Sequence, residues 1–228
     1  MALPGFVSLP LFRRIYPSIR RSEGSSITPI CRKVDFVDPK LAYEFNRIFN
    51  TSLLLQAENP INYSLPVPKI DFLNYLCDWR RLVAHGTNMM DLDILQPVRN
   101  STDLSEFGNR QQIFSSPDAI YAMWFAIMDR SICEKTQNGC IGIGHDQHRE
   151  KYYHFELPGE LEGKFPFKQG TIYLARAEAF PSRHRIPVLN FFGGEYEEWG
   201  SAEPVKPLAK ITVEPADFPY LDQVQYCL

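Results

Sequence analysis

Apolar positions in the first third of the chain recur at helical spacing. Asp38-Pro39 supplies an N-cap residue followed by a favoured first helical residue. The apolar residues that follow would share one helical face: Leu41, Phe45, Ile48 and Phe49. Residues 70–79 repeat the pattern, after a proline-rich stretch at 59–69. The sequence therefore predicts two helices before residue 80.

The middle of the chain predicts two short strands and a buried helix. Residues 81–87 indicate a strand that ends in a glycine turn, and a polar loop follows from about 88 to 110. Residues 112–114 indicate a second strand. Ser116-Pro117 then predicts a helix start, with Ser116 as N-cap and Asp118 in the first turn. Residues 119–128 are apolar almost all round, so this helix should be buried.

Later residues predict strands separated by proline and glycine. The candidates are 152–157, 171–175, 186–191, 196–201 and 208–213. Helices first and strands last favour an α+β fold over a doubly wound sheet. We expect an N-terminal arm at 1–34 and a single domain at 35–228, whose helical part is 35–79.

Composition and charge narrow the function classes. The 228 residues can bury a core without disulfides, and 24 basic against 27 acidic residues give a net charge of −3. That charge argues against nucleic-acid binding through bulk positive charge, and no apolar run is long enough to span a bilayer.

Five scattered cysteines without a Cys-x-x-Cys indicate a reduced, cytoplasmic or intracellular protein. Arginines and serines near the N-terminus suggest mitochondrial targeting as an alternative, although Pro10 and Pro17 interrupt an amphipathic helix.

Aromatic residues make up 13% of the chain, which fits a large core or a stacking site for a flat ligand. Three separated segments fit cleavage of an N-glycosidic bond to nicotinamide: His85-Gly86-Thr87, the region from Phe114 to Phe125, and residues 195–199. Aromatic rings would clamp the nicotinamide, and a glycine would let backbone approach its carboxamide. His85 or Thr87 would bind ribose hydroxyls, and a carboxylate would stabilise the oxocarbenium-like transition state.

These segments resemble the ADP-ribosyltransferase superfamily, on the side of poly-ADP-ribose polymerases and diphtheria-type toxins. His85-Gly86-Thr87 matches the His-Gly-Ser/Thr motif that closes the first strand, and Phe114 stands where the family carries tyrosine, in a later strand just before a helix. The resemblance implies a split antiparallel β-sheet core with an N-terminal helical extension. It implies NAD as the substrate, bound in a cleft, with no metal. The implied catalytic residues are His85, Phe114 and Glu198, and the implied NAD-binding residues are His85, Gly86, Thr87, Phe114, Ser115, Tyr121 and Phe125.

Two departures from this family pattern matter. Phenylalanine at 114 keeps a stacking face but loses a hydroxyl. The acid is ambiguous among Glu195, Glu197, Glu198 and Glu203, and Glu195-Tyr196-Glu197 resembles the Glu-x-Glu of the Arg-Ser-Glu branch, whose Ser-Thr-Ser is missing here. We expect Glu198 to be the acid, with ADP-ribose passing to water or to an unidentified acceptor.

Other interpretations remain open at this level. The chain could be a catalytically silent module that binds NAD or ADP-ribose. Cys133, Cys140, His145 and His148, with His154 nearby, could instead form a zinc-containing interaction domain, although their spacing is unusual. Residues 139–144 are glycine-rich without phosphate-loop spacing, so we expect a flexible loop there. Tyr121, Trp124, Phe125, Phe114 and His85 could each be ordinary core residues.

Overall fold

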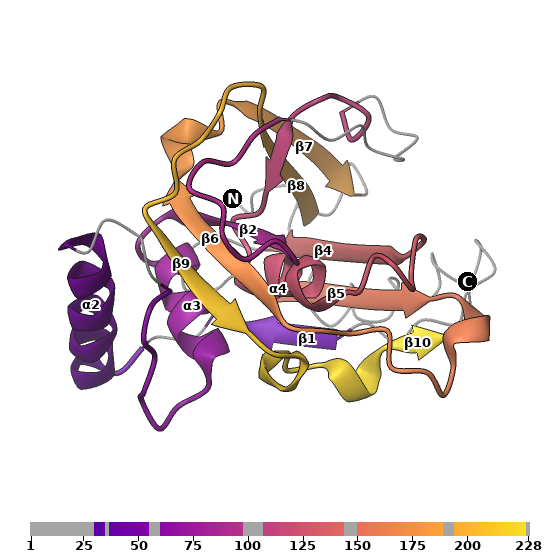
Figure 1. Ribbon diagram of the computed structural model, residues 1–228, viewed down its shortest axis with the longest axis horizontal. Helices are drawn as coiled ribbons and strands as arrows, with labels where there is room; N and C mark the ends of the chain where they lie inside the picture. Colours follow the sequence, from indigo (N-terminus) through magenta and orange to yellow (C-terminus); the bar gives the residue numbers. More distant parts are fainter. Residues whose placement is uncertain are drawn as a thin grey trace, which may run out of the picture.

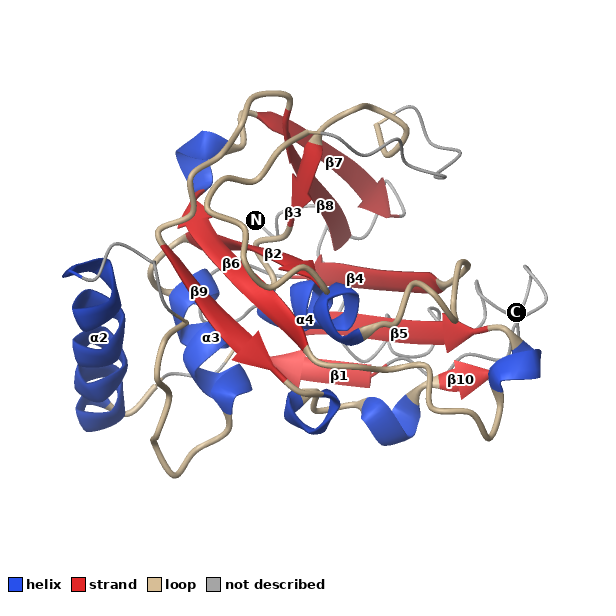
Figure 2. Ribbon diagram, in the orientation of Figure 1, coloured by secondary structure: helices blue, strands red, loops and turns tan. Residues whose placement is uncertain are grey.

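The described part of the chain is an α+β structure with three α-helices and mostly antiparallel strands (Figures 1 and 2). The computed structural model describes residues 30–34, 37–54, 60–97, 107–143, 150–188 and 194–226, with the backbone alone at 185–188 and 194–196. The helices are α2 (Pro39–Leu54), α3 (Lys69–Asp78) and α4 (Ala119–Ile127). The strands are β1 (Ile30–Lys33), β2 (Leu82–Thr87), β3 (Ile113–Ser115), β4 (Gln137–Ile143), β5 (Glu150–Leu157), β6 (Gly170–Arg176), β7 (Ser182–Val188), β8 (Gly194–Ser201), β9 (Ala209–Val213) and β10 (Gln225–Tyr226).

The strands form a seven-stranded and a three-stranded sheet. The larger sheet runs β1-β5-β4-β8-β3, with β10 beside β5 and β7 beside β8. The smaller sheet runs β2-β6-β9 and crosses in front of the larger one in Figure 1. Pairing is antiparallel throughout these described strands, except between β10 and β5. The predicted α+β class is confirmed.

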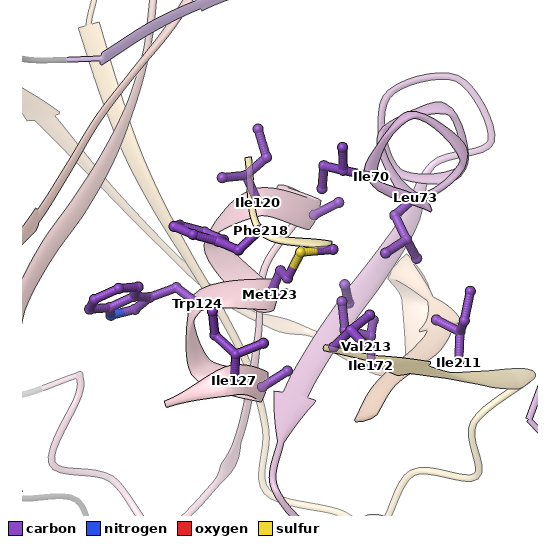
Figure 3. Close-up of a cluster of buried hydrophobic side chains, with 14 of the residues drawn as sticks. Ile70, Leu73, Ile120, Met123, Trp124, Ile127, Ile172, Ile211, Val213 and Phe218 are labelled. Carbon is purple, nitrogen blue, oxygen red and sulfur yellow. The ribbon is translucent and has the colours of Figure 1, made fainter. Parts of the chain in front are cut away.

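Helix α4 lies between the two sheets and forms the centre of the main core. It packs on β2 and β6 on one side, while Trp124 reaches Phe155 of β5 on the other, with ring centroids 4.9 Å apart. Leu73 of α3, together with Ile172 and Ile211 of the smaller sheet, closes this core around α4 (Figure 3). The apolar sequence of α4 is therefore explained by burial against two sheets.

Helix starts follow the capping residues. The carboxylate of Asp38 accepts hydrogen bonds from the N–H groups of Lys40 and Leu41, as predicted for an N-cap. The expectation for α4 was wrong by two residues: Asp118 is its N-cap and accepts from Tyr121 N–H, while Ser116 Oγ accepts from Asp118 N–H. The N-cap is the residue directly before the first helical residue. In α4 that residue is Asp118, and Pro117 lies one position before it.

The last residues of the expected N-terminal arm pack on the domain, and one predicted loop is a strand. Residues 30–33 form the edge strand β1 on β5, while residues 1–29 lie outside the described residues. The glycine-rich segment expected to be a loop forms β4 as far as Ile143. A Cβ at Gly139 would lie 2.3 Å from the ring of His154, so glycine there makes room for a buried side chain on β5. No helix in the described ranges has the length and apolar character needed to cross a membrane.

Candidate functional site

The two sheets meet at one backbone pair and then separate at His85. Ala84 and Ser116 exchange both backbone hydrogen bonds, at 2.8 and 2.9 Å, in an isolated pair between β2 and β3. The next such pair would join Gly86 to Phe114. Instead, Nδ1 of His85 donates to the carbonyl oxygen of Phe114 at 2.7 Å. This bond places the proton of a neutral imidazole on Nδ1, so that Nε2 carries the acceptor lone pair.

Gly86 directs its backbone toward the point where the strands separate. Backbone groups alternate between the two edges of a strand, so the N–H and C=O of Gly86 have the same direction as those of Ala84, away from β6. The structure adds a packing reason for glycine at this position. A Cβ on Gly86 would lie 1.9 Å from the carbonyl oxygen of Ala122, so glycine is needed for α4 to rest on β2.

The hydroxyl of Thr87 closes the turn after β2. Its Oγ1 accepts from Met89 N–H at 3.2 Å. The hydroxyl of buried Tyr173 holds the same loop, because it accepts from Leu92 N–H and donates to the Met89 carbonyl. The ring of Tyr173 lies 6.5 Å from that of His85, centroid to centroid. These contacts fix the segment that carries the predicted motif.

Phe114 and Glu198 share one face of the larger sheet. Phe114 pairs with Gly200 in the β3–β8 register, and Glu198 lies two residues from Gly200, so both side chains project to the same side. The ring of Phe107 spans this face: it meets Phe114 edge-on at 6.0 Å and stacks on His184 at 5.2 Å. His184 lies opposite Glu198, with Nδ1 3.8 Å from Oε2. Glu198 and Phe114 are therefore diagonal neighbours on this face, and the Phe114 carbonyl accepts from His85.

The other candidate acids occupy different positions. Glu197 alternates with Glu198, so it projects to the face of buried Trp199. Glu203 is exposed and lies beyond the end of β8, where Ser201 Oγ bonds its backbone. The backbone of Glu195 pairs with Gly142, but its side chain lies outside the described residues. Among the acids whose side chains are described, Glu198 alone shares the face of Phe114.

The aromatic residues of α4 divide into two groups. Trp124 is fully buried against Phe155, Phe167 and Phe218, so it belongs to the core. Tyr121 and Phe125 are half-buried and meet edge-on at 5.2 Å, one helical turn apart. The guanidinium of Arg130 lies over the ring of Phe125 at 5.4 Å. Tyr121 and Phe125 are thus the helix residues whose rings keep an exposed surface.

Ser115 projects to the opposite side of β3 from Phe114. It pairs with Trp199, whose side chain packs in the smaller core with Ile113. Its Oγ is buried and has no hydrogen-bond partner among the described residues. Ser115 and Phe114 therefore cannot contact a ligand from the same face of the strand.

A buried ion network holds the start of α4. Nζ of Lys151 lies 2.8 Å from carboxylate oxygens of both Asp78 and Asp118, and Arg32 lies 2.9 Å from Asp78. The hydroxyl of Tyr153 also donates to Asp118. Burial by itself raises the pKa of Asp118, but Lys151 and Arg32 lower that pKa to about 2. Burial and the Asp118 charge raise the pKa of Tyr153 well above its ordinary value.

The cysteines and histidines considered for zinc do not form a metal-binding cluster in the described part of the chain. Sγ of Cys133 donates to the carbonyl of Lys135, and Cys140 lies on β4 opposite Tyr153. His154 is buried against Gly139, while His145 and His148 lie outside the described residues. Across the described ranges, no group of three or more His, Cys, Asp or Glu side chains is placed to hold a metal ion.

Sequence reasoning missed His184 and Phe107. The strand around residue 186 was expected to begin after His184, and Phe107 was assigned to a polar loop. One signal for His184 was available in the sequence. Two predicted strands follow each other there, and the strands of a hairpin place residues on either side of the turn opposite each other. The segment before residue 190 would then pair with the acidic segment after it. Phe107 offered no comparable signal.

Comparisons with known proteins add no assignment, because no protein-family model, curated protein or solved structure matches this chain.

Proposed function

We propose that the protein is an NAD-dependent ADP-ribosyltransferase, or an NAD glycohydrolase when water is the acceptor. The proposal extends to the fold: a split antiparallel sheet of ADP-ribosyltransferase type, with α2 and α3 as its helical extension. The observation that carries the proposal is the separation of β2 from β3 directly after the Ala84–Ser116 pair, where His85 binds the Phe114 carbonyl.

The groups near this separation suit the nicotinamide end of NAD. A carboxamide offers one donor and one acceptor, which match a backbone C=O and N–H such as those of Gly86. Half-buried rings at Phe114, Tyr121 and Phe125 offer stacking surfaces for a flat heterocycle. Nε2 of His85 can accept from a ribose hydroxyl, given that Nδ1 is the donor to Phe114.

Glu198 is proposed to stabilise the transition state. When the bond between ribose C1′ and the nicotinamide nitrogen breaks, its electron pair leaves with nicotinamide and positive charge develops on the ribose. A carboxylate fixed beside the ribose stabilises that charge. The Glu198 side chain is 17% exposed, so it is partly shielded from water and its field is less screened. Loss of this charge should lower turnover by roughly 10²- to 10³-fold.

Nicotinamide release tests the assignment. The protein is incubated with NAD and free nicotinamide is followed by chromatography. Glu198→Gln and His85→Ala should both lower the rate, while Glu197→Gln should leave it near wild type because that side chain projects to the other face. Undiminished release in both Glu198→Gln and His85→Ala would refute the site. If nicotinamide release is lost in Glu197→Gln or Glu203→Gln but kept in Glu198→Gln, the catalytic acid is that other glutamate and not Glu198.

A catalytically silent NAD-binding module is the second candidate. Phe114 favours it, because a tyrosine hydroxyl that the family pattern carries is missing at that position. This candidate predicts no nicotinamide release, together with a melting temperature raised by NAD. Phe114→Tyr would then be the variant in which release could appear.

A further inference from the structure

We propose that His184 is the acceptor-side base, which takes the proton from a neutral nucleophile such as water or an alcohol as that nucleophile attacks. The inference rests on the proposed NAD chemistry at Glu198 and extends it to a residue that the family pattern does not carry. His184 lies on β7 directly opposite Glu198 on β8, and Nδ1 is 3.8 Å from Oε2 of the carboxylate.

The environment of His184 suits a base that is oriented by a carboxylate. Nδ1 is buried and makes no hydrogen bond to any described residue, although it faces Glu198. The side chain as a whole is 43% exposed, so solvent reaches the rest of the ring. Phe107 stacks on the imidazole at 5.2 Å and an interplanar angle of 30°, which fixes the ring plane. With the ring held in this way, a rotation of the Glu198 side chain would shorten the 3.8 Å distance from Nδ1 to the carboxylate to a hydrogen bond, as expected when a loose catalytic pair tightens around substrate.

The division of roles follows from this geometry. The Glu198 carboxylate fixes the proton on Nδ1, so Nε2 carries the lone pair on the solvent-facing part of the ring. The acceptor oxygen forms a bond to C1′ as the bond from C1′ to the nicotinamide nitrogen breaks. Nicotinamide leaves neutral with the electron pair, and the acceptor proton passes to Nε2 of His184 and then to solvent. A water molecule or an alcohol has such a proton, whereas an anionic nucleophile has none.

Azide distinguishes a base from a merely structural residue. Wild type and His184→Gln are incubated with NAD alone, with methanol or with sodium azide, and nicotinamide and the ADP-ribosyl products are quantified. Glutamine keeps hydrogen-bonding capacity but cannot take the proton. With water or methanol, His184→Gln should turn over about 10²- to 10⁴-fold more slowly than wild type. Azide, which needs no deprotonation, should restore nicotinamide release and give ADP-ribosyl azide.

Arg183→Gln is the matched control. Arg183 neighbours His184 on β7 but faces the other side, where its guanidinium lies 3.8 Å from the ring centroid of Trp199. This variant should turn over like wild type. A wild-type rate in His184→Gln would overturn the base, and so would a loss that azide does not restore while NAD still raises the melting temperature. A wild-type protein that releases no nicotinamide with water, methanol or azide would refute the proposed function itself, and this inference with it.

Discussion

The buried ion network beneath α4 predicts a large loss of stability when one cation is removed. Lys151 is 4% exposed at its side chain and contacts Asp78 and Asp118 at 2.8 Å each. Methionine at 151 fills similar space, so little cavity forms. Among the described residues, Arg32 is then the one cation left beside the two buried carboxylates, 2.9 Å from Asp78 but 3.8 Å from Asp118. Breaking a buried pair in this way costs about 3–5 kcal/mol.

Urea and thermal unfolding measure this cost. For a chain of this size, each kcal/mol lowers the melting temperature by roughly 2–4 °C, so Lys151→Met should melt about 6–20 °C lower. Lys168→Met is the control, because Lys168 also contacts an aspartate at 2.7 Å but is 43% exposed. Water and salt screen that exposed pair, so Lys168→Met should melt near wild type. Equal losses in the two variants would refute the reasoning.

A double-mutant cycle isolates the pair. Asp118→Asn keeps an oxygen that can accept from Tyr121 N–H, so the helix cap survives while the charge is lost. Lys151→Met and Asp118→Asn together leave the buried Arg32–Asp78 pair balanced. The double variant should therefore be more stable than the sum of the single losses predicts, by at least about 1 kcal/mol. Strict additivity would show that Lys151 and Asp118 do not interact.

Three further outcomes are expected. Folding lowers the pKa of Asp118 from 3.8 to about 2, so its carboxylate contributes roughly 2 kcal/mol to the free energy of unfolding above about pH 4, and this contribution disappears as the pH falls through 2. The urea concentration at the unfolding midpoint should therefore fall across this pH range in wild type and change less in Asp118→Asn. Gly86→Ala should destabilise by about 1–3 kcal/mol through its clash with Ala122, whereas Gly159→Ala, whose Cβ meets nothing nearer than 3.9 Å, should melt like wild type. Asp38→Ala should cost about 1 kcal/mol through loss of the α2 cap, and Asp38→Asn should not; chemical denaturation compares the two.

Local patterns sufficed to locate the helices, although the start of α4 was predicted two residues too early. Their apolar faces are encoded within a few residues of each other, as in the run from Ala119, and the cap of α2 is encoded at Asp38. Strand β4 could not be read in the same way, because Gly139 is required by a side chain on another strand. The left-handed backbone of Arg81, with φ of 54°, likewise explains why β2 begins one residue later than expected. Such requirements depend on tertiary neighbours and leave no periodic trace.

The candidate site shows the same division. The residues His85, Phe114 and Glu198 could be chosen from their types and segments. Which acid faces Phe114 depended on the β3–β8 register, and a shift of one residue would have selected Glu197. The contact between His184 and Glu198 depended on the β7–β8 register. The segments of the candidate site could therefore be predicted from the sequence, whereas the side chains that lie next to each other depend on the strand pairing.

Two glycines of the smaller sheet set the rotation of α4 and, through it, the aromatic rings at the site. A Cβ at Gly86 would lie 1.9 Å from the Ala122 carbonyl oxygen, and one at Gly170 would lie 1.8 Å from the Ala126 carbonyl oxygen. Ala122 and Ala126 are one turn apart, so this pair of contacts fixes which line of the helix faces the sheet. The residues just before them, Tyr121 and Phe125, are displaced by about 100° around the helix axis. Gly86 of the His-Gly-Thr motif thus affects the positions of Tyr121 and Phe125, the proposed stacking rings, through its contact with α4. Replacing Gly86 should therefore displace these two rings as well as the strand β2.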